Sequence, residues 1–230
     1  MTRILVPVEV LEGKTVSPGL MNLLGTVDVT VLGYHVLPEQ TPPDQARLQY
    51  EERATDALED LCEEFETAGG VADHRLVFTH DREQTFDRIA NEVNARAFAI
   101  SGVAGDVDQL LVSLSGDVAV DRILAFVEAL VGDREIRVTL LLAGDKPDEG
   151  LLENAADQLR GAGIEVQTEL ARGNSPFRAL MEEIPGHDTV IMGEKAPSIR
   201  SLVFGDDPDR VASASVCPVL VVRYDESLDG

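Results

Sequence analysis

Short apolar runs alternate with longer amphipathic segments along the whole chain. The apolar runs are rich in β-branched residues and bounded by turn residues, which predicts buried strands. The longest amphipathic segment begins at Pro42–Pro43, ends before Gly69–Gly70 and carries apolar residues three and four apart, which predicts a helix. Strands are predicted at 4–8, 27–36, 72–80, 97–101, 110–114, 136–143, 164–170, 189–192 and 218–222, and helices at 17–25, 43–68, 84–94, 117–131, 148–161, 175–183 and after Asp206.

This alternation predicts an α/β fold, because buried strands separated by helices form parallel sheets covered by those helices. The pattern also restarts near the middle of the chain. Residues 79–102 align without a gap on residues 170–193, so that Phe86 matches Phe177 and Gly102 matches Gly193. We therefore predict two tandem doubly wound domains, 1–105 and 106–230. The first lacks the last helix and strand that the second has.

Composition narrows the functional classes. The chain has 230 residues, 42 of them acidic and 19 basic, and a net charge of -23. So negative a chain without a basic segment is not expected to bind nucleic acid or an anionic lipid surface. Only three basic residues are lysines (Lys14, Lys146 and Lys195), and scarce lysine with abundant carboxylates indicates adaptation to high salt. An ordinary acidic protein is the alternative.

The two cysteines, Cys62 and Cys217, lie far apart in the sequence and belong to no metal-binding motif. No apolar run approaches the roughly 18 residues of a membrane span, and the first residues lack the apolar stretch of a signal peptide. We therefore expect a cytoplasmic protein that does not insert into membranes. The four histidines show no metal-ligand spacing, and no nucleophile and base pair is evident, so we do not expect an enzyme.

The segments 192–212 and 217–223 resemble the closing part of the universal stress protein family, and Arg3-Ile4-Leu5-Val6-Pro7-Val8 resembles its first strand. The resemblance covers nearly the whole chain as two copies. It implies a doubly wound five-stranded sheet, pairing as a homodimer or between tandem copies, and a role in stress tolerance. Some members bind ATP and others do not. Final strands commonly mediate pairing in this family, so the resemblance also implies an interface at residues 218–222.

The ATP-binding members share a loop with the pattern Gly, two residues, Gly, nine residues, then Gly followed by Ser or Thr. Here Gly193 fits the first position, Ala196 replaces the second glycine, and only eight residues separate Ala196 from Gly205. Asp206 replaces the hydroxyl residue, and Asp207 and Asp209 follow. Carboxylates favour the start of a helix but repel phosphates, so the resemblance implies a degenerate nucleotide site.

ATP-binding members also carry an aspartate just after the first strand. Glu9 holds that place in the first half, and Ser115 holds it in the second, shortly after Ser113. The candidate nucleotide-binding residues are therefore Glu9, Ser113, Ser115, Gly193, Ala196, Gly205 and Asp206, with ATP as the possible ligand. The sequence favours a non-catalytic regulatory module, and the alternatives are a nucleotide sensor or a cytosolic regulator of a membrane transporter.

Overall fold

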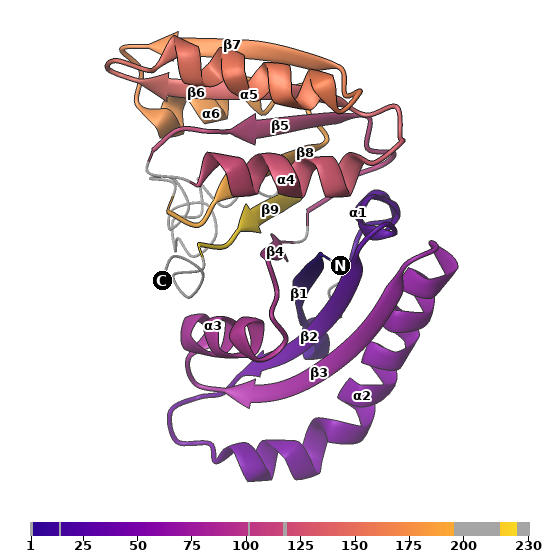
Figure 1. Ribbon diagram of the computed structural model, residues 1–230. Helices are drawn as coiled ribbons and strands as arrows, with labels where there is room; N and C mark the ends of the chain where they lie inside the picture. Colours follow the sequence, from indigo (N-terminus) through magenta and orange to yellow (C-terminus); the bar gives the residue numbers. More distant parts are fainter. Residues whose placement is uncertain (1, 14, 101, 117–118, 196–216, 225–230) are drawn as a thin grey trace. The chain divides into compact units, whose positions relative to one another are not determined.

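The computed structural model describes residues 2–13, 15–100, 102–116, 119–195 and 217–224 (Figure 1). It divides into two compact units, residues 1–101 and 102–230, which are described separately. The predicted alternation of strands and helices is confirmed. The helix predicted after Asp206 lies outside the described residues.

The first unit contains four parallel strands and three α-helices. The strands lie in the order β3-β2-β1-β4, so the first strand is internal and the third lies at an edge. The elements are β1 (Arg3–Glu9), α1 (Pro18–Leu24), β2 (Asp28–Val36), α2 (Pro43–Thr67), β3 (Val71–Thr79), α3 (Arg82–Glu92) and β4 (Ala97–Ile100). A short 3-10 helix, η1 (Val10–Glu12), follows β1 and was not predicted.

Helices cover both faces of this sheet. A Cβ built on Gly33 would lie 2.5 Å from the Leu58 side chain, so α2 packs closely on that face of β2. The neighbouring residue, Tyr34, points to the opposite face and meets Phe86 of α3 with ring centroids 5.0 Å apart. Because successive strand residues face opposite sides, these two contacts show that the first unit is doubly wound.

The ends of α1 and α2 show what the sequence could specify locally. Pro18 and Pro43 begin the two helices, close to the predicted starts at residues 17 and 43. Gly69 follows α2 with φ +93°, a conformation that favours glycine and terminates helices. Ser17 takes the N-cap position of α1, but its side chain makes no capping hydrogen bond there.

The described part of the second unit contains five parallel strands in the order β9-β8-β5-β6-β7. Its described elements are β5 (Gln109–Ser113), α4 (Val120–Val131), β6 (Arg137–Gly144), α5 (Glu149–Gly161), β7 (Val166–Arg172), α6 (Pro176–Glu183), β8 (Thr189–Gly193) and β9 (Val219–Val222). Asp188 joins the amino ends of β8 and β5, because its Oδ2 accepts hydrogen bonds of 2.9 Å from the amides of Asp108 and Gln109.

The two units share a strand order. In each, the first strand lies between the second and the fourth, and the third strand lies at an edge. In the described residues, the second unit has a fifth strand, β9, next to its fourth, whereas the first unit shows four. In both units the chain adds its second and third strands on one side of the first strand and its fourth strand on the other. The switch point therefore lies between the first and fourth strands.

Candidate site at the carboxyl edge of the second sheet

Ligands of open α/β sheets bind at the carboxyl ends of the strands, beside the switch point. In the second unit this point lies between β5 and β8. Ser113 ends β5, Ser115 follows it, and Gly193 ends β8, so the structure brings these three predicted residues to the same edge. Glu9 ends β1 of the first unit, in register with Tyr34, and so belongs to the other switch point. Ala196, Gly205 and Asp206 lie outside the described residues, as do Asp207 and Asp209.

Both predicted serines are buried. Ser113 is 3% exposed and lies in register with Met192 of β8. Ser115 is 1% exposed, and its Oγ accepts a hydrogen bond of 2.8 Å from the amide of Ala143 on β6. The Ser115 hydroxyl therefore fastens the segment after β5 to the neighbouring strand, a structural role that the sequence did not reveal.

Replacing Ser115 with alanine should destabilise the second unit by about 1 to 3 kcal/mol, because the buried amide of Ala143 would lose its acceptor. Chemical denaturation would measure this change. Thr168→Ala, on the edge strand β7, is the matched control and should have a much smaller effect. An unchanged free energy of unfolding for Ser115→Ala would show that the hydrogen bond from the Ala143 amide does not stabilise the second unit.

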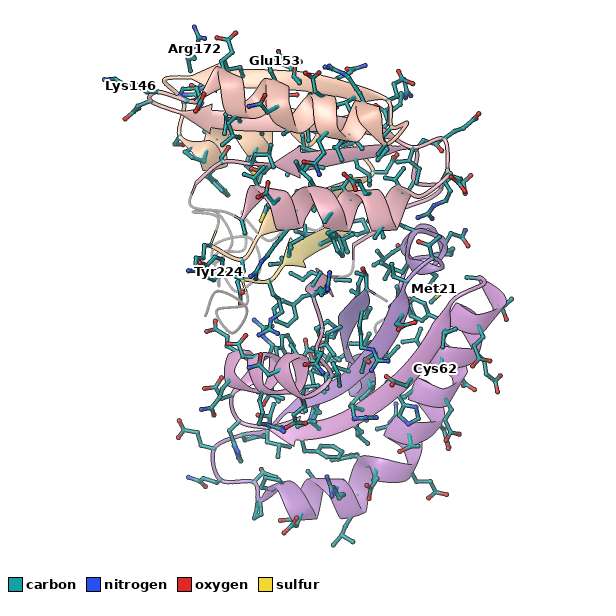
Figure 2. The ribbon with its side chains drawn as sticks, in the orientation of Figure 1. Met21, Cys62, Lys146, Glu153, Arg172 and Tyr224 are labelled. Atoms are coloured by element: carbon teal, nitrogen blue, oxygen red, sulfur yellow. The ribbon has the colours of Figure 1, made fainter. Side chains whose placement is uncertain are left out.

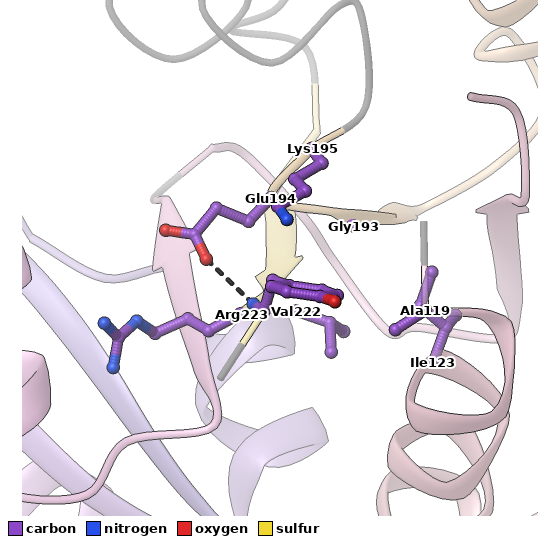
Figure 3. Close-up of a pocket in the computed structure, with 8 residues that line it drawn as sticks. Ala119, Ile123, Gly193, Glu194, Lys195, Val222 and Arg223 are labelled. Carbon is purple, nitrogen blue, oxygen red and sulfur yellow. Dashed lines mark hydrogen bonds between the residues drawn. The ribbon is translucent and has the colours of Figure 1, made fainter. Parts of the chain in front are cut away.

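A small pocket lies where β8 and β9 end, and Figure 3 shows its lining. The residues that line it are Ala119, Ile123, Gly193, Glu194, Lys195, Val222, Arg223 and Tyr224. Its volume is about 10 Å³, close to the least that one water molecule needs. Of the predicted site residues that the structure describes, Gly193 lines this pocket.

The Glu194 and Tyr224 segments are joined beside this pocket. The Glu194 amide donates to the Val222 carbonyl at 2.8 Å, and a Glu194 carboxylate oxygen accepts from the Tyr224 amide, also at 2.8 Å (Figure 3). The Lys195 ammonium lies 3.4 Å from the centroid of the Tyr224 ring. Arg122 of α4 approaches the same ring, with its guanidinium carbon 5.5 Å from the centroid. These cation–π contacts stabilise the ring at the mouth of the pocket.

Sequence reasoning missed Arg122, Glu194, Lys195 and Tyr224 as members of this cluster. One signal was available, since Lys195 is one of three lysines in the chain and directly follows the predicted glycine region. Tyr224 and Arg122 carry no motif, and they meet because β9 ends beside the start of α4.

The two cysteines belong to other parts of the fold, since Cys62 lies on α2 of the first unit and Cys217 precedes β9. Burial, with a smaller contribution from Asp188, raises the pKa of Cys217 to about 11. Burial likewise raises the pKa of Cys62, with smaller contributions from Asp73, Glu66 and Glu59. Figure 2 shows Cys62 on α2. Both thiols are free and protonated at neutral pH, so neither is activated as a nucleophile.

Within the described residues, no group of three or more histidine, cysteine, aspartate or glutamate residues is placed to hold a metal ion. None of the helices in the described ranges has the length and apolar character to cross a membrane.

The structure is similar to a universal stress protein from Archaeoglobus fulgidus DSM 4304, with a TM-score of 0.66 and 17% sequence identity over 97% of each chain. The chain has the fold of a universal stress protein. A putative aspartate carbamoyltransferase from Leishmania major Friedlin matches with a TM-score of 0.26 and 17% identity, over 99% of this chain and 74% of that one, and a score so low carries no argument. No protein-family model and no curated protein sequence matches the chain.

Proposed function

We propose that the protein is a non-catalytic regulatory module of the universal stress protein type, acting in stress response, with a degenerate nucleotide site. One observation carries the proposal: where β8 and β9 end, the described side chains leave room for about one water molecule. Tyr224 lines this pocket of about 10 Å³ and contacts Glu194 and Lys195. A nucleotide could therefore enter only if Tyr224 or its neighbours moved aside.

Melting temperatures with and without millimolar Mg·ATP test this proposal. We expect a shift below about 1 °C, because a ligand that does not bind the native state does not stabilise it. The control is Mg²⁺ with a non-nucleotide salt at equal ionic strength, since an acidic protein can be stabilised by ions alone. A shift of about 5 °C beyond that control would correspond to real binding and would overturn the degenerate site.

The second candidate function is an ATP sensor. It is favoured by the gathering of Arg122, Lys195 and Arg223 near the pocket, in a chain with 19 basic residues against 42 acidic ones. If this candidate is right, Mg·ATP raises the melting temperature and Lys195→Glu abolishes that rise. Lys146→Glu, the same charge change in the loop between β6 and α5, should preserve it.

The proposal extends to organisation and setting. The shared strand order supports two tandem copies of one domain, with boundaries near 1–105 and 106–230, of which the first lacks its last helix and strand. The copies would pair with each other or through a homodimer, and a membrane transporter is a possible partner of a cytoplasmic module.

Scarce lysine supports a salt-rich cell. A rise in the free energy of unfolding from low to molar salt is expected, and a fall would contradict this setting.

A further inference from the structure

The edge strand β3 of the first unit is suited to pairing with the same strand of a second copy. It lies at the end of the strand order, and its whole length, from Val71 to Thr79, is in register with β2 on one side. Val71 is 69% exposed, and Arg75 is exposed as well. Such an edge leaves main-chain donors and acceptors available to another strand.

Two hydrogen bonds show which residues of β3 direct their main chain outward. The Thr79 carbonyl accepts from Leu37 at 2.7 Å and therefore faces the β2 side. The His74 carbonyl accepts instead from the side chain of Arg75, at 2.9 Å, and therefore faces away from β2. Because main-chain direction alternates along a strand, the outward residues of β3 are Ala72, His74, Leu76 and Phe78.

A symmetric antiparallel pair of two β3 strands must be centred on one residue, so that residues equally far from the centre lie opposite each other. With His74 at the centre, outward Ala72 meets outward Leu76. The two His74 residues exchange main-chain hydrogen bonds once each Arg75 side chain leaves its own His74 carbonyl for Asp73 of the other copy. The same register places Asp73 of each copy directly opposite Arg75 of the other. Only a centre at His74 places Asp73 opposite Arg75, because His74 lies midway between them. A centre at Asp73 or at Arg75 would instead place two like charges opposite each other.

The side chains fit this register. Asp73 and Arg75 lie on the sheet face opposite α2, together with Val71, which would meet Val77. Among the described residues, the ion pair of Asp73 is a long one, 3.9 Å from Arg3, and its Oδ1 is buried without a hydrogen-bond partner there. Opposed charges across two strands stabilise the pair, whereas like charges oppose it.

The edge strand of the second unit gives a useful contrast. In β7 the charged residues Glu169 and Arg172 are separated by an odd number of positions, so one has its main chain directed inward and the other outward. Residues opposed in a symmetric pair must face the same way, and these two can therefore never be opposed. The complementary pattern is a property of β3.

We propose that two copies of this chain associate through antiparallel pairing of β3 centred on His74, with reciprocal Asp73–Arg75 contacts. An antiparallel strand at the edge of a parallel sheet is a common arrangement. The inference deepens the homodimer proposed above by naming its surface. It does not depend on the nucleotide site, so failure of either leaves the other standing.

Sedimentation of the full chain over a range of concentrations tests this interface, in about 0.15 M salt, where long-range repulsion between two acidic chains is screened more than the short Asp73–Arg75 contacts. We expect the wild type to dimerise reversibly. Arg75→Asp and Asp73→Arg should each weaken the dimer by about tenfold or more, since each opposes like charges twice. The matched controls on β7, Arg172→Asp and Glu169→Arg, make the same charge changes and should leave the association unchanged.

Restoring complementarity provides the decisive readout. The double variant Asp73→Arg/Arg75→Asp should dimerise again, and an equimolar mixture of the two single variants should form a heterodimer, because the four charges then meet their opposites. Circular dichroism checks that each variant is folded. A wild type that stays monomeric, a dimer indifferent to both single variants, or a failure of the double variant to restore association would each overturn the proposal.

Discussion

Replacing Gly102 with alanine is expected to destabilise the second unit by about 2 to 4 kcal/mol. A Cβ at this position would lie 2.4 Å from the carbonyl carbon of Cys217 and 2.6 Å from the nitrogen of Pro218. Both atoms belong to the main chain that leads into β9, so no flexible side chain can move aside. The added methyl group must displace this segment or be accommodated by strain.

Denaturant unfolding of the full chain would measure the loss, and hydrogen exchange would locate it in β8 and β9. Gly105→Ala is the matched control, because a Cβ there has nothing within 4 Å, and its effect should be small. Equal stability of the Gly102 and Gly105 variants would contradict the close approach of residue 102 to the β9 segment.

Replacing Phe65 with alanine should destabilise the first unit by about 3 to 5 kcal/mol. Phe65 is fully buried on α2 and is among the largest side chains with no exposed surface. Its removal loses apolar burial and leaves a cavity that neighbouring side chains fill only in part. Unfolding midpoints would measure the effect.

Leu48→Ala on the same helix provides the control. Leu48 is 91% exposed, so its truncation removes little burial and should change the free energy of unfolding by less than about 0.5 kcal/mol. Comparable losses for the two variants would mean that α2 packs with a different face toward the sheet.

The sequence predicted most of the fold, because the apolar periodicity is strong and the breaks are marked by proline and glycine. The helix predicted at 43–68 is α2, and the strand predicted at 27–36 is β2. It did not predict η1, whose three residues are too short to show a period. The edge position of β3 follows from pairing between distant segments, which local patterns do not encode.

The candidate site was predicted less completely. The sequence placed Ser115 and Gly193 near the ends of two strands, and the structure places both at one switch point. The sequence could not predict that the Ser115 hydroxyl accepts a hydrogen bond from the Ala143 amide. Nor could it predict that the Tyr224 ring contacts Lys195 and Arg122. Those contacts join residues far apart in the sequence that share no motif, and only the folded chain brings them together.

The most direct test of the central proposal is a crystal structure of the protein soaked with Mg·ATP. The proposed degenerate site predicts no nucleotide at Gly193, with the Tyr224 ring still against Lys195 and its amide still bonded to Glu194. Nucleotide density beside Gly193, with the Tyr224 ring displaced, would contradict it.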